Sequence, residues 1–194
     1  MKETLIEEIL AYEWQMFITV NDRNDHDPLT AGRPSCRDFP EEFKVHRMSQ
    51  FIAWSETSLD SYLHDLQDAQ KAGRNLMTYK YARMENLIPC ANQSTLIAKI
   101  SAHQLVWQKE FIEKYPKMMS GGRALDGDRK GIDWASFETY LTAELETYSE
   151  NTLESLYRDV CAYKERGASM SDAVYDYLVA QKGYQSPDEA ERCK

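Results

Sequence analysis

The chain has 194 residues, 42% of them hydrophobic and 28% charged, and its 32 acidic and 23 basic residues give a net charge of −9. These proportions exclude a largely disordered protein, and the acidic balance argues against partners that are nucleic acids or anionic membranes. No run of 18 apolar residues and no signal-peptide pattern is present, so the sequence predicts a cytoplasmic protein with a single helical domain over residues 1–194.

The first elements are two amphipathic helices that are separated by a long polar segment. Apolar residues recur with a helical period over residues 3–20, which predicts the first helix. Residues 21–39 are rich in Asp, Asn, Gly and Pro, which predicts a loop. An apolar stripe then continues in phase over residues 41–72, and Gly73 follows it as a C-terminal cap would. We therefore predict one long second helix.

The rest of the chain continues as helices with one further long loop. The predicted helices cover residues 75–87, 94–115, 136–166 and 170–182, and a short last helix begins at Pro187. Residues 118–134 contain four glycines and are predicted to form the second loop. No segment alternates apolar and polar residues over the length of a strand. The fold expected is all-α, an irregular bundle of six to seven helices with two long loops, and these loops are candidate lids.

Two glutamates stand in the apolar faces of predicted helices. Residues 6, 9, 10, 13, 17 and 20 share one face of the first helix, and only Glu13 is not apolar. Residues 137, 141, 144, 148 and 152 share one face of the helix over 136–166 and include Glu144. A buried carboxylate without a partner is unfavourable, so each must be paired, protonated or bound to a metal.

Basic residues at the edges of other apolar faces are the expected partners. Lys80 and Arg83 lie one turn apart beside the apolar stripe of the helix over 75–87. Arg47, Gln50 and Trp54 lie in a row beside the stripe of the second helix. The sequence therefore predicts that acids and bases from four segments meet in a shared interior.

Two functions are compatible with such an interior. The first is a pocket for a small anionic metabolite or nucleotide, in an enzyme or a binding protein. The anion would be held by the cations Arg47, Lys80 and Arg83, assisted by Gln50. Glu13 or Glu144 would act as general base or bind an ammonium group of the ligand. The apolar walls of the pocket would be Trp54, Tyr81 and Tyr148. The alternative is a non-catalytic interaction module, with a protein partner, whose buried charges are structural salt bridges.

A metal-dependent site has weaker support in the sequence. His64-Asp65, with His46 upstream and Asp133 downstream, loosely resembles the ligands of helical metal-dependent phosphohydrolases. A dipeptide of this kind is common, and the Glu-x-x-His pairs of di-iron bundles are missing. We assign no metal ligand, and the identity of any cofactor stays unknown.

Several motifs resemble an uncharacterised bacterial family that is described only as a domain of unknown function. They are Glu13-Trp14, Arg33-Pro34-Ser35-Cys36, Ser49-Gln50-Phe51 with Trp54, Gly73-Arg74-Asn75-Leu76, Lys80-Tyr81-Ala82-Arg83-Met84, Lys114-Tyr115-Pro116, Glu138-Thr139-Tyr140 and Glu144-Leu145. The Lys-Tyr-Ala-Arg-Met run is the most specific of them. The resemblance implies a helical domain and carries no activity, and it suggests only loosely, by analogy of fold, a nucleotidyltransferase-like partner.

Overall fold

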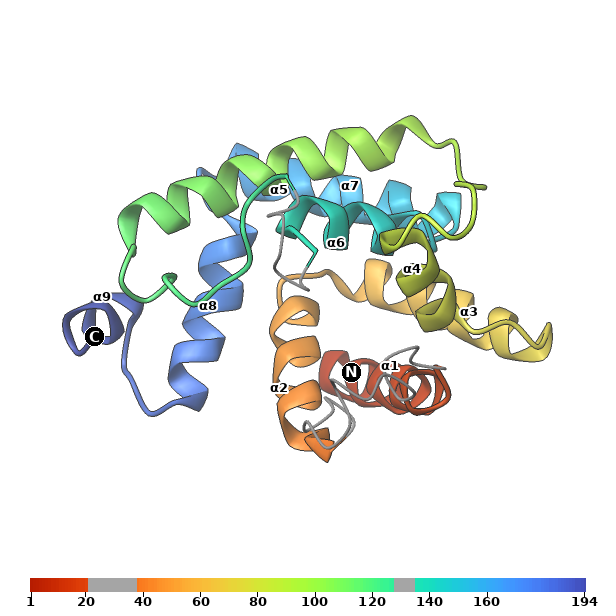
Figure 1. Cartoon of the computed structure of the whole chain (residues 1–194), viewed down its shortest axis with the longest axis horizontal. Coiled ribbons are helices and arrows are strands. Elements are labelled where there is room, and N and C mark those ends of the chain that lie inside the picture. The colour runs from red at the N-terminus through yellow and green to blue at the C-terminus, as the bar shows by residue number, and fades with distance from the viewer. Residues whose placement is uncertain (21–37, 128–134) are drawn as a thin grey trace.

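The computed structural model describes residues 1–20, 38–127 and 135–194. Most of the predicted loop over 21–39, with its Arg-Pro-Ser-Cys motif, lies outside these ranges. So do residues 128–134 of the predicted loop over 118–134. The suggested role of the two loops as lids therefore stays a prediction. The described ranges form helices that are named as in Figure 1: α1 (Lys2–Ile18), α2 (Pro40–Phe51), α3 (Glu56–Lys71), α4 (Leu76–Met84), α5 (Thr95–Lys114), α6 (Phe137–Leu145), α7 (Glu150–Glu165), α8 (Met170–Gln181) and α9 (Pro187–Arg192).

The predicted all-α class is confirmed, but the predicted number of helices is wrong. The described residues form nine helices and no strand, where six or seven helices were expected. The difference arises because two long predicted helices are each broken in two. The helix expected over 41–72 is divided into α2 and α3, and the helix expected over 136–166 is divided into α6 and α7.

Both breaks are made by a serine that starts a new helix. Ser55 and Ser149 have extended backbones, and their hydroxyls accept the N–H groups of Ser58 and Thr152. The apolar stripe resumes in nearly the same phase after each break, so helical periodicity alone does not reveal it. Similar side-chain caps, each from a serine or an asparagine, precede all the helices from α3 to α9.

Helices α3 and α7 form an antiparallel pair. Each helix supplies a carboxylate to the serine that caps the N-terminus of the other. Asp159 of α7 accepts the backbone N–H of Ser55 at 2.9 Å, and Asp65 of α3 accepts the backbone N–H of Ser149 at 2.9 Å. A carboxylate at a helix N-terminus satisfies unpaired N–H groups and interacts favourably with the helix dipole. These reciprocal contacts stabilise both breaks.

The core is arranged around α3, which packs against α1 on one side and α7 on the other. Helix α5 packs against α6 and α7, α4 packs against α6, and α2 packs against α8 (Figure 1). Fully buried apolar side chains from α1, α3 and α7 fill the centre: Ile9, Leu59, Leu66, Leu153 and Val160. None of the described helices combines the length and apolar character needed to span a bilayer.

Candidate functional site

Glu13 of α1 and Glu144 of α6 are both buried, and Arg47 of α2 lies between them. The Arg47 Nε donates to Glu13 Oε2 at 2.7 Å, and its Nη2 donates to Glu13 Oε1 at 2.5 Å and to Glu144 Oε1 at 2.6 Å. The side chains of Arg47, Glu13 and Glu144 are only 4%, 0% and 8% exposed. One guanidinium group therefore bridges carboxylates from two helices that are far apart in the chain.

Lys80 of α4 completes a group that we call the charge cluster: Glu13, Arg47, Lys80 and Glu144. The Lys80 Nζ donates to Glu144 Oε2 at 2.8 Å and lies 3.6 Å from the centroid of the Tyr140 ring. An ammonium group over an aromatic face is stabilised by the ring quadrupole. The structure thus brings the two predicted acids together with two of the three predicted bases.

Polar side chains around the charge cluster satisfy its remaining hydrogen-bonding positions. Tyr62 donates its hydroxyl to Glu13 Oε1 at 2.7 Å, and Tyr148 donates its hydroxyl to Glu144 Oε1 at 2.9 Å. Gln50 Oε1 accepts from Arg47 Nη1 at 2.5 Å. Sequence reasoning missed the roles of Tyr62 and Tyr140. A signal was present for Tyr62, since a tyrosine in phase with a buried stripe needs a partner for its hydroxyl.

Two of the three predicted apolar walls lie beside the charge cluster. Trp54 and Tyr148 pack edge to face at 5.8 Å between ring centroids, and Tyr62 lies 4.8 Å from Tyr148. Tyr81, the third, is half-buried and packs toward Phe17 with ring centroids 6.3 Å apart. The aromatic side of the cluster is therefore built from α3 and the segments that follow α2 and α6.

Arg83 forms a separate ion pair at the edge of the interior. Its Nε and Nη2 donate to Glu146 at 2.5 and 3.2 Å, and its Nη1 donates to the carbonyl of Ile88 at 2.6 Å. Its side chain is 19% exposed, against 3% for Lys80. Although the two residues lie one turn apart on α4, Lys80 lies in the interior while Arg83 lies along its rim. Glu146 as the partner of Arg83 was not predicted.

The charge cluster is electrically balanced, with two acids and two bases. Burial acts to raise the pKa of Glu144, but the charges of Arg47 and Lys80 outweigh this and hold the pKa well below its ordinary value. Burial acts to lower the pKa of Arg47, but Glu13 and Glu144 raise it well above the usual range. Burial and the neighbouring carboxylates also raise the pKa values of Tyr62 and Tyr148. All of these groups therefore keep one protonation state near neutral pH.

Glu144 should make the stability of the protein depend on acidic pH. Because its pKa is lowered by folding, its charge stabilises the protein above the ordinary carboxyl pKa of about 4.3, and this contribution is lost as the pH falls toward the lowered value. We expect the destabilisation caused by Glu144→Gln to be largest at neutral pH and to shrink below about pH 4. Urea unfolding of both proteins across this range measures the effect, and a constant difference contradicts it.

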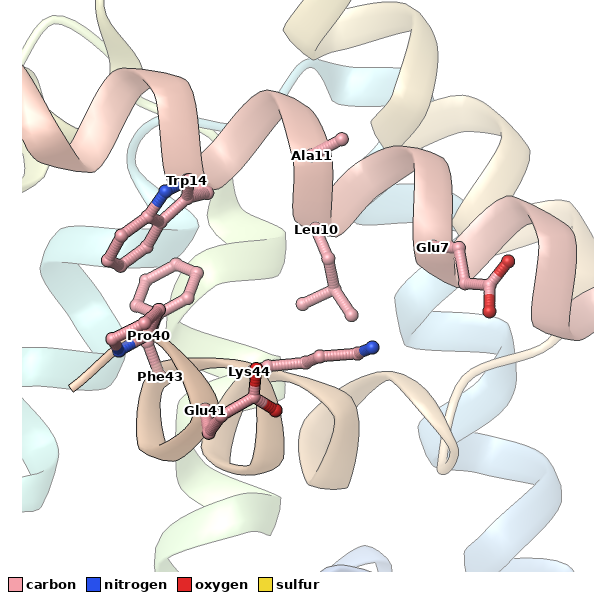
Figure 2. A pocket seen from close by; sticks show the side chains of 8 residues that line it. All are labelled: Glu7, Leu10, Ala11, Trp14, Pro40, Glu41, Phe43 and Lys44. Carbon is pink, nitrogen blue, oxygen red and sulfur yellow. The ribbon is translucent and has the colours of Figure 1, made fainter.

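Two hollows lie on the surface of the part of the chain that the structure describes. One, of about 330 Å³, lies between α1 and α2 and is lined by Leu10, Trp14 and Phe43. Figure 2 shows Trp14 and Phe43 at one end of this hollow and Glu7 at the other. The second, of about 400 Å³, lies between α5 and α6. The charge cluster lines neither of them.

The residues considered for a metal site make separate contacts. The side chain of His64 is 66% exposed, and its Nδ1 lies 2.8 Å from the carbonyl of Asp60. Asp65 accepts the N–H of Ser149, and Asp133 lies outside the described residues. Over residues 1–20, 38–127 and 135–194, no group of three or more His, Cys, Asp or Glu side chains is placed to hold a metal ion.

Comparison with known proteins identifies the family of the chain. A family model described as "Protein of unknown function (DUF4125)" matches residues 3–192. No curated protein and no solved structure matches the chain. The match covers nearly the whole sequence and confirms the resemblance to an uncharacterised family.

Proposed function

Since the chain belongs to the DUF4125 family of unknown function, we propose from its geometry that it is a non-catalytic helical interaction module. In this proposal the buried charges are structural salt bridges, and the protein acts through its surface. The observation that carries the proposal is that every charged group of the charge cluster is paired with another group of the cluster. Both acids and both bases already hold one another at 2.5 to 2.8 Å, so no net charge is left for a ligand.

The hydrogen bonds of the buried groups support the same conclusion. Among the described residues, the one buried side-chain oxygen or nitrogen without a partner is Ser101 Oγ, which belongs to α5 and not to the charge cluster. A pocket that awaits a polar ligand is expected to present unsatisfied groups to it, because specific recognition uses convergent polar atoms. The charge cluster presents none.

A structural role for the charge cluster suits an interaction module. The charge cluster forms directional hydrogen bonds that connect α1 with α2, α2 with α6, and α4 with α6. Paired buried charges add little net stability, but they can select one packing arrangement over others. A module of this kind would present a surface of defined shape to its partner.

The first function expected from the sequence, a pocket for an anionic metabolite or nucleotide, stays a prediction. An anion at this position would have to replace Glu13 or Glu144 as the partner of Arg47 or Lys80. Such a replacement needs a conformational change that separates contacts of 2.5 to 2.8 Å. The two proposals therefore differ in a measurable way.

Thermal unfolding with a panel of nucleotides, phosphorylated metabolites and amino acids separates them. A ligand at one hundred times its Kd stabilises the folded state by about 2.7 kcal/mol, which shifts Tm by several degrees. We expect no shift that depends on the charge cluster. The control is the Lys80→Met, Glu144→Met variant, which keeps the cluster neutral. An anion that raises the Tm of the natural protein and not of this variant overturns the proposal.

A further inference from the structure

We propose that the hollow between α5 and α6 receives a lysine side chain of a partner protein. This inference rests on the proposed function and assigns it a contact site and a partner chemistry. The hollow has a volume of about 400 Å³ and lies between α6 and the first half of α5 with the residues just before it. Three features of the hollow favour a lysine: its shape, one unpartnered hydroxyl and its charge.

The wall from α5 is apolar and shallow. Ala98, Ala102 and Leu105 follow one another at helical spacing along this wall, and both alanines are exposed. Small side chains here leave room for a slender chain to lie along the helix. The four-methylene stem of a lysine can bury itself against such a surface while its charged end reaches polar groups.

The residues that line the hollow include Ser101, whose hydroxyl has no hydrogen-bond partner among the described residues. Ser101 is only 7% exposed, and its Oγ is the single buried side-chain polar atom without a hydrogen bond among the described residues. A buried hydroxyl that loses its hydrogen bonds to water is unfavourable by about 1–3 kcal/mol when nothing replaces them. A ligand that donates a hydrogen bond to this hydroxyl would remove that cost.

The wall from α6 carries oxygen acceptors at intervals of one turn. Glu138, Thr142 and Glu146 lie at positions i, i+4 and i+8 and all line the hollow. Arg83 neutralises Glu146, whereas Glu138 is exposed and forms no ion pair with any described residue. This wall therefore keeps a negative charge, in a chain whose net charge is −9.

A lysine side chain matches these features together. Its ammonium group has three donors and accepts nothing, so it suits a carboxylate and two hydroxyls, which are the groups of Glu138, Ser101 and Thr142. Its stem suits the alanine wall. A carboxylate or phosphate ligand would instead meet Glu138 as a like charge. The partner expected is thus a protein with an exposed basic segment.

Binding is tested by NMR on the full chain, with peptides that differ in a single group. The probe is the acetylated, amidated tripeptide Ala-Lys-Ala, and its control replaces Lys with norleucine, which keeps the stem and lacks the ammonium. We expect the lysine peptide to shift the amide signals of Ala98, Ala102 and Thr142. We expect the norleucine peptide to bind at least about tenfold more weakly, because a charge-assisted hydrogen bond is lost.

Two variants locate the site. Glu138→Gln changes an exposed side chain, so the fold is retained, and it should weaken the lysine peptide by about two- to fivefold while leaving the norleucine peptide unchanged. Ala102→Phe should fill the hollow and abolish binding of both peptides.

Three results overturn the inference. They are equal binding of the two peptides, signal changes centred away from the hollow, and no change at the highest soluble peptide concentration. Butylamine that binds as tightly as the peptide also overturns it, because the site would then serve free amines and not a protein side chain. None of these outcomes affects the thermal-unfolding test of the charge cluster, so failure here is distinguishable from failure of the proposed function.

Discussion

Arg47→Met is expected to lower the free energy of unfolding by about 3–5 kcal/mol, because it leaves two buried carboxylates without their shared cation. Methionine fills a similar volume, so little of the loss would come from a cavity. The oxygens of Glu13 would keep only the hydroxyl of Tyr62, and Glu144 would keep Lys80 and Tyr148. Urea unfolding followed by circular dichroism measures the change. If the variant is too unstable to fold, addition of a stabilising osmolyte restores a measurable transition.

Arg83→Met is the matched control, since it also removes a guanidinium that holds one glutamate. The Arg83–Glu146 pair is 19% and 11% exposed, against 4% and 0% for Arg47 and Glu13. Water can solvate the remaining carboxylate of Glu146, so the loss should be clearly smaller. Equal losses in the two variants would show that burial of the charge cluster has no special energetic role.

The second large effect is expected from a double-mutant cycle on Lys80 and Glu144. Either single change to methionine leaves an unbalanced buried charge, and we expect each to destabilise the protein by about 3–5 kcal/mol. The double variant removes one charge of each sign and leaves Arg47 paired with Glu13. It should therefore be less destabilised than the sum of the single variants by at least about 2 kcal/mol.

A third substitution refines this cycle. In the double variant the hydroxyl of Tyr148 has lost its acceptor, Glu144. Tyr148→Phe in the same background removes that unpartnered group and should recover about 1–3 kcal/mol. Apolar replacement of a buried ion pair can equal or exceed the natural stability when no polar group is left over. Strict additivity of Lys80→Met and Glu144→Met would contradict a structural role for the pair.

The positions of the buried acids could be predicted because helical periodicity is a local property. Glu13 and Glu144 each interrupt an otherwise apolar face, and a face of that kind must be buried in a protein of this size. The need for partners then follows from electrostatics alone. Lys80 and Arg47 were found in the same way, from rows adjacent to apolar stripes.

The choice of partners could not be predicted, because it depends on tertiary arrangement. Lys80 and Arg83 look equivalent in sequence, yet one binds Glu144 in the interior and the other binds Glu146 at the rim. The division of two long helices was also missed, because a capping serine competes with a stripe that stays in phase across it. Ser55 and Ser149 become recognisable once Asp159 and Asp65 are known to approach their N–H groups.

The sequence separation of the contacts has a consequence for the order of folding. The helix caps from α3 to α9 join residues two or three positions apart, so they can form within an isolated segment. The charge cluster joins residues 34, 64 and 97 positions apart. Closing contacts this distant costs more chain entropy than closing a local cap. We therefore expect the local caps to form early and the four charged groups to leave water late, when their counterions are already beside them.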